Sequence, residues 1–204
     1  MDQFSFFFGF YGLILGLAVA ELLSGFARLV RARAVRKIDA RTALLATFIF
    51  LLLCATWIDA FRNPEVTLDF SGLWAPILIA TCYYLAASVI FPTDEAEFDR
   101  LDDYFSERKW FVVAMIFSAD IFYNIQLFGI YVSEFADRPA NFWLVLLPFN
   151  LLVNSLYIAL LVMKGRRANI ACLAGLNMAF VAIYWSSDWL SSMADQRLGH
   201  LWSA

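Results

Sequence analysis

The sequence predicts an all-α integral membrane protein: a polytopic bundle of six transmembrane helices forming one domain over residues 1–204. Composition is the first reason, because 62% of the chain is hydrophobic and only 16% is charged. A soluble domain has about 45–50% apolar and about 25% charged residues. The second reason is that six apolar stretches are long enough to cross a hydrocarbon core of about 30 Å, which needs roughly 20 helical residues. The third is the alternation of positive charge between them.

The predicted spans cover residues 4–27, 43–61, 73–91, 110–132, 142–163 and 168–190. The second and fourth connections, "RNPEVTLDFSG" and "SEFADRPAN", contain the Pro, Gly and Asn that stop helices. The fifth, "KGRRAN", is long enough only for a hairpin between antiparallel neighbours. An Ala18-x-Ala20 pattern resembles a signal-peptidase site, but the preceding "MDQ" carries no cation, so six spans are kept.

The third connection predicts a short amphipathic helix on the cytoplasmic surface. Phe98, Leu101 and Phe105 recur at helical spacing, and acids fill the other face. Anionic lipid repels such a face, so a partner that docks through Asp99, Asp102 and Asp103 would be a protein. The basic connection after the first span is the nearest candidate partner, and a solvated charged face without a partner remains the default interpretation.

Lysine and arginine predict the orientation, because they resist translocation and remain in the cytoplasm. Only Arg62, Arg138 and Arg197 lie on one side. Twelve lie on the other: Arg28, Arg31, Arg33, Arg36, Lys37, Arg41, Arg100, Arg108, Lys109, Lys164, Arg166 and Arg167. Both termini are therefore predicted outside, in a plasma membrane of the bacterial inner-membrane type.

Two faces of small residues predict close helix contacts, because helices in lipid associate by close backbone approach. Gly12, Gly16, Ala20 and Ser24 form one face in the first span, and Ala171, Gly175 and Ala179 form a shorter one in the sixth. Packing within the chain is the first interpretation. A seam between copies in a homo-oligomer is the second.

Glu21 is a carboxylate inside the first apolar span, and Arg28 follows on the same helix face. A charged residue at that depth should meet a partner, water or a pathway. Two interpretations stay open: a neutral or Arg28-paired side chain near the cytoplasmic boundary, and a contribution to a polar pathway.

Asp120 stands near the middle of the fourth span, with Tyr123 and Asn124 on its face. The fifth span carries Asn150 and Asn154, and the sixth carries Asn177. Asp120, Asn154 and Asn177 fall at one predicted depth on three helices. They either hydrogen-bond across helices to hold the bundle together or line a wet cavity. Asn would hold a dry bundle without an ionisation cost, so the carboxylate favours the cavity.

Several classes of function find no support in the sequence. Cys54, Cys82 and Cys172 are isolated, and the only histidine is His200, so neither a disulfide framework, a metal cluster nor a Ser–His–Asp triad is predicted. No cofactor, phosphate-binding loop or basic nucleic-acid face is expected. A membrane-embedded enzyme would have to use isolated acids.

We therefore expect a channel or transporter for an ion, a proton or a small polar solute, with its pathway among spans four to six. The alternative is a non-transporting accessory or signalling subunit that docks a partner through the acidic helix.

Overall fold

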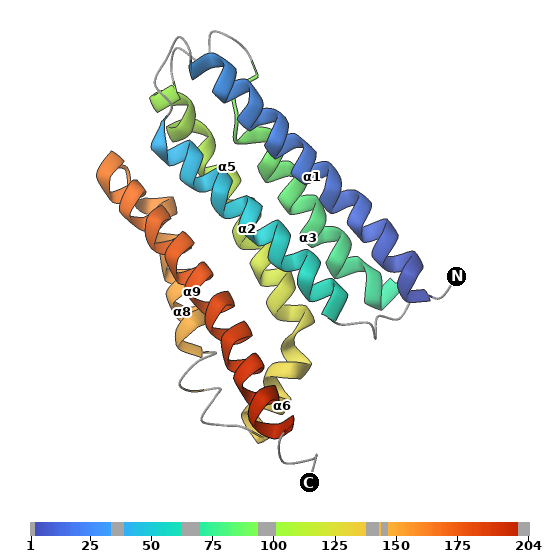
Figure 1. Ribbon diagram of the computed structural model, residues 1–204. Helices are drawn as coiled ribbons and strands as arrows, with labels where there is room; N and C mark the ends of the chain where they lie inside the picture. Colours follow the sequence, from blue (N-terminus) through green and yellow to red (C-terminus); the bar gives the residue numbers. More distant parts are fainter. Residues whose placement is uncertain are drawn as a thin grey trace.

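The computed structural model describes residues 3–33, 39–62, 70–93, 101–137, 143 and 147–199. These ranges are helical apart from short connections and contain no strand. The helices are α1 (Gln3–Arg33), α2 (Ala40–Arg62), α3 (Phe70–Val89), α5 (Leu101–Gln126), α6 (Phe128–Asp137), α8 (Leu147–Val162) and α9 (Arg166–Gly199) (Figure 1). Each long helix begins where the preceding one ends, so neighbours along the chain run antiparallel (Figure 1).

Among the described residues, four helical segments are long and apolar enough to cross a membrane: Phe4–Arg31, Ala40–Arg62, Gly72–Val89 and Arg166–Tyr184. They contain most of the first, second, third and sixth predicted spans. Leu147–Val162 is apolar but shorter. Pro148 lies in its first turn, where a missing backbone N–H costs nothing because no intrahelical acceptor exists there.

The predicted amphipathic helix is not a separate element where the structure describes it. α5 runs without interruption from Leu101 into the predicted fourth span, so the acidic segment forms its first turns. Residues 94–100, including Asp99, lie outside the described residues. The predicted fourth span instead breaks at Leu127, between α5 and α6.

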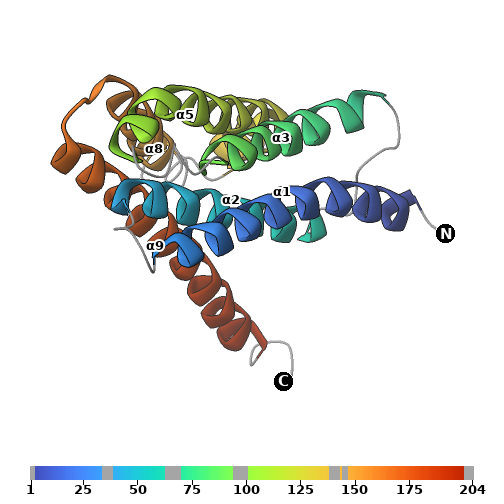
Figure 2. The same cartoon turned by 90° about the horizontal axis from the view of Figure 1, so that it is seen from above.

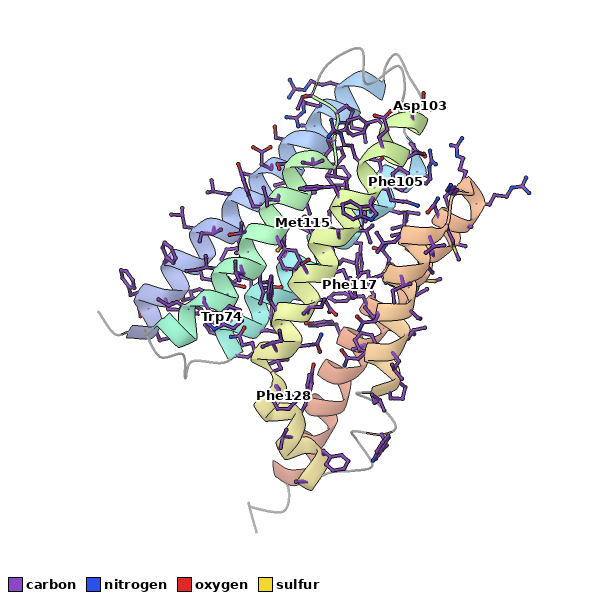
Figure 3. The ribbon with its side chains drawn as sticks, turned by 180° about the vertical axis from the view of Figure 1, so that it is seen from behind. Trp74, Asp103, Phe105, Met115, Phe117 and Phe128 are labelled. Atoms are coloured by element: carbon purple, nitrogen blue, oxygen red, sulfur yellow. The ribbon has the colours of Figure 1, made fainter. Side chains whose placement is uncertain are left out.

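The helices form two layers, α1, α2 and α9 in one and α3, α5 and α8 in the other (Figure 2). α3 packs against α1 and α5, α2 packs against α1 and α9, and α8 packs against α5 and α9. Phe105, Met115, Phe117 and Phe128 follow α5 into α6 along the length of the bundle (Figure 3).

The packed face of α1 follows helical spacing and consists of Phe7, Tyr11, Leu15, Ala18, Leu22 and Leu29, all buried. Gly25 continues this face. A Cβ atom added there would lie 2.6 Å from Cγ and 2.7 Å from Cε2 of Phe91, and closer still to Cδ2. Glycine therefore allows the buried Phe91 ring to lie directly on the α1 backbone.

A buried polar network joins the helices at the end of the bundle where α1 finishes. Arg41 forms an ion pair with Asp39 at 2.9 Å, and its guanidinium lies 4.6 Å from the Phe105 ring centroid. Lys109 Nζ donates to the backbone oxygen of Met163 and, at 3.4 Å, to Asn169 Oδ1. Burial and then the neighbouring charge of Arg41 lower the pKa of Lys109. This network fastens α2, α5, α8 and α9 together.

The first turns of α5 also attach to the end of α3. Tyr104 donates its hydroxyl to the backbone oxygens of Val89 at 2.7 Å and Phe91 at 3.0 Å. Asp103 is exposed on the other side, and the side chain of Asp102 is outside the described residues. Arg41 on α2 contacts this segment through the Phe105 ring.

Candidate functional site

A cavity of about 560 Å³ lies among α5, α6 and α8. Its polar lining comes from α5 and α6 on one side and from α8 on the other. It comprises Asp120, Asn124, Tyr131, Asn150 and Asn154. Asp120 and Asn124 are four residues apart, as are Asn150 and Asn154, so each pair occupies a single helix face. The cavity thus brings together the polar residues predicted on the fourth and fifth spans, together with Tyr131.

Hydrogen bonds connect most of these groups in a chain. Asn124 Nδ2 donates to the backbone oxygen of Asp120 at 2.8 Å and to Asp120 Oδ2 at 3.2 Å. Tyr131 donates its hydroxyl to Asn124 Oδ1 at 2.9 Å, and a hydrogen bond also joins Tyr131 to Asn150. The polar lining therefore crosses from α5 through α6 to α8.

Two oxygen acceptors in the cavity retain capacity for a ligand. Asp120 Oδ1 makes no hydrogen bond to any described residue, although an ionised carboxylate can accept about four. Asn154 donates through Nδ2 to the backbone oxygen of Asn150 at 2.7 Å, and its Oδ1 has no partner among the described residues. One acceptor thus comes from α5 and the other from α8.

The structure places Asn177 outside this cavity, contrary to the prediction of one shared polar layer. Its Nδ2 donates to the backbone oxygens of Leu44 on α2 at 3.2 Å and Leu173 on α9 at 2.8 Å. Its Oδ1 is buried and has no partner in the described part of the chain. Asn177 therefore links α9 to α2.

Glu21 is also absent from the cavity lining and lies half-buried on α1. Within the described ranges it has neither a hydrogen bond nor an ion pair. Arg28 instead donates through Nη1 to Ser24 Oγ at 3.0 Å. The structure describes no Glu21–Arg28 pair, and the two other interpretations of Glu21, a neutral side chain and a pathway residue, stay predictions.

Tyr123 faces a second polar group, Asp59, which was not predicted from the sequence. Its hydroxyl donates to Asp59 Oδ2 at 2.8 Å, and Tyr184 donates to the same oxygen at 2.9 Å. Tyr11 and Tyr83 lie within electrostatic range of that carboxylate. Asp59 thus holds α2, α5 and α9 together at the end of the bundle opposite Lys109.

Asp59 could be missed because it stands three residues before Arg62, at the edge of an apolar span. A charged residue is ordinary at a membrane surface. Predicted depth gave no signal either, because Asp59 is two residues from the outer end of its predicted span and the four tyrosines are six to ten residues from theirs.

The small-residue faces lie beside the packed interfaces. A Cβ added at Gly16 or Gly175 would meet no atom within 4 Å, and Ala20, Ser24 and Ala171 are exposed. Gly12 is close only to Trp57, at 3.8 Å, and Ala179 is half-buried. Packing within the chain therefore does not explain the small-residue face of α1. A contact between copies of the chain through this face stays a prediction.

Within the described ranges, no three His, Cys, Asp or Glu side chains gather closely enough to hold a metal ion. Cys54, Cys82 and Cys172 are free thiols. No protein-family model matches the chain, and neither a curated protein nor a solved structure matches it.

Proposed function

We propose that this protein is a membrane channel or transporter for a cation, a proton or a small polar solute, and that the Asp120 cavity is its binding site. We further propose six spans, counting α5 with α6 and α8 as the fourth and fifth, with both termini outside. The distribution of twelve cations against three supports this orientation.

The observation that carries the proposal is a carboxylate with an unused oxygen, facing a cavity inside an apolar bundle. Placing an aspartate at the centre of a membrane helix costs about 2.5–3.5 kcal/mol on insertion scales. Asparagine would make the same contact with Asn124 without that cost. A role for the negative charge explains why the site has a carboxylate.

The depth of the cavity supports the same proposal. Asp120 is ten residues beyond Trp110, at the proposed cytoplasmic edge. At the rise of an α-helix, Asp120 therefore lies about 15 Å into the bilayer. From there the lining extends to Leu147, at the beginning of α8. The cavity would therefore lead from the membrane midplane towards the outer surface, as one half of an access pathway would.

Flux measurements in proteoliposomes test this function. We expect protein-dependent flux of at least one of H⁺, Na⁺, K⁺ or a small organic cation, and at least a tenfold loss in Asp120→Asn. Asp103→Asn is the matched control, since it makes the same substitution on the same helix at an exposed position. Equal flux in wild type and Asp120→Asn, or no flux of any of these solutes, would contradict the proposal.

The accessory-subunit alternative rests on the exposed acidic side of α5, where Asp103 lies. Tyr104 and Phe105 hold the opposite side of this segment against α3 and Arg41. Docking of a partner through Asp99, Asp102 and Asp103 stays a prediction.

A further inference from the structure

The Asp120 cavity has apolar walls around its polar groups. Ile121, Ile125, Phe128 and Leu147 line it together with the polar residues. Ile125 and Phe128 are 52% and 67% exposed, so the cavity also opens onto the side of the bundle. Phe128 stands at the junction of α5 and α6 (Figure 3). In a membrane, acyl chains would adjoin this opening, so a molecule dissolved in the bilayer could enter from there.

The polar groups left available in the cavity favour a ligand that donates hydrogen bonds. Asn124 and Asn154 each direct an amide nitrogen to a backbone oxygen of their own helix, at 2.8 Å and 2.7 Å. Two acceptors, Asp120 Oδ1 and Asn154 Oδ1, have no described partner, against one remaining N–H donor on Asn154 Nδ2. A primary ammonium has a positive charge and three N–H donors, which is enough for both acceptors.

A bare metal ion fits this arrangement less well than an organic cation. In the described part of the chain, Asp120 belongs to no group of three His, Cys, Asp or Glu side chains that could hold a metal ion. A metal ion would also leave the isoleucine and phenylalanine walls without a partner. An organic ammonium with an apolar body would cover them, and a volume of about 560 Å³ is in the range of sites for drug-sized ligands.

We propose that the Asp120 cavity binds amphipathic organic amines in their cationic form, with the ammonium between Asp120 and Asn154 and the apolar body against Ile121, Ile125 and Leu147. This inference rests on the proposed function, because it names the substrate class of the same site. The carboxylate supplies charge complementarity. The opening beside Ile125 and Phe128 supplies entry from the bilayer.

Calorimetric titration of the full chain in detergent tests the inference with two probes of nearly identical shape, 1-naphthylmethylamine and 1-naphthylmethanol. We expect the amine to bind at least tenfold more tightly than the neutral alcohol at neutral pH, where the amine is protonated. Asp120→Asn should remove this preference, and Asp120→Glu should retain most of it. Circular dichroism of each variant verifies that the helical fold is intact.

A wall substitution tests the position of the apolar body. Ile125→Ala should weaken amine binding about tenfold, because it removes apolar contact area. Ile158→Ala makes the same change at an exposed position on α8 outside the cavity, and it should leave binding unchanged.

The outcomes separate this inference from the proposed function. Equal binding of both probes, or amine binding that Asp120→Asn leaves unchanged, would overturn the inference. Asp120-dependent flux of H⁺, Na⁺ or K⁺ without any amine binding would also overturn it, while the proposed function would stand. Asp120-dependent amine binding without flux would support the amine site and count against transport.

Discussion

Gly25→Ala is expected to destabilise the protein strongly, by about 1–3 kcal/mol, as overpacking of a filled core typically does. The new Cβ would lie 2.6 Å and 2.7 Å from two atoms of the Phe91 ring. That ring is 1% exposed and lies 5.1 Å from the Phe26 ring centroid, and Tyr104 holds its backbone oxygen. The ring therefore has little freedom to move aside. Thermal unfolding in detergent, followed by circular dichroism, should show a midpoint several degrees below wild type.

Gly16→Ala is the matched control, since it makes the same change on the same helix where no atom lies within 4 Å. It should leave the midpoint near wild type or raise it slightly, because alanine favours the helix. Adding Phe91→Leu should recover part of the stability lost in Gly25→Ala, since the smaller side chain makes room. Equal midpoints for Gly25→Ala and Gly16→Ala would show that α1 does not pack on Phe91 in this way.

Asp59→Ala is expected to cost about 1–4 kcal/mol. The substitution removes the acceptor of two half-buried tyrosine hydroxyls, and a fully buried donor left unsatisfied costs about 1–3 kcal/mol. Asp59→Asn should cost less, because its amide oxygen can still accept from Tyr123 and Tyr184. Unfolding midpoints of the three proteins should therefore rank wild type, Asp59→Asn, Asp59→Ala.

A mutant cycle separates this effect from general disruption of α2. In a Tyr123→Phe, Tyr184→Phe background no hydroxyls remain to be left unpaired, so Asp59→Ala should cost much less. The same cost in both backgrounds would mean that the described bonds to Asp59 do not hold α5 and α9 to α2.

The sequence was sufficient to predict the apolar helices because span length and hydropathy are local properties. The first, second, third and sixth predicted spans each contain a helix long and apolar enough to cross a membrane. The polar positions on α5 and α8 could also be predicted. Spacing places Asp120 with Asn124 and Asn150 with Asn154 on single faces, and the cavity brings these pairs together.

The rotation of each helix within the bundle could not be predicted. On α1, Leu15 and Leu22 are fully buried while Leu13 and Leu23 are 63% and 54% exposed. Lipid and protein interior are both apolar, so the same residue suits either face and leaves no amphipathic signal. The small-residue face was therefore a poor guide to packing, and the close contact occurs at Gly25 instead.

The hydrogen-bond partners of the polar side chains could not be predicted either. Asn124, Asn154 and Asn177 all donate to the carbonyl four residues earlier on their own helix. Helical spacing alone cannot show which of them also faces a cavity or a neighbouring backbone. Asp59 and its tyrosines come from helices up to 125 residues apart in the chain, so only the tertiary packing reveals them.

A polar binding site at Asp120 requires that water reaches the cavity beside it. The most direct test is the reactivity of Asn154→Cys towards a charged, membrane-impermeant methanethiosulfonate. The variant is made in a background with Cys54, Cys82 and Cys172 replaced by alanine. The reagent is added from the outer side to sealed vesicles or spheroplasts. Ile158→Cys is the control, one turn further along α8 and 53% exposed on the outside of the bundle. We expect modification of Asn154→Cys and little of Ile158→Cys. Reaction at Asn154→Cys no faster than at Ile158→Cys would contradict a hydrated site.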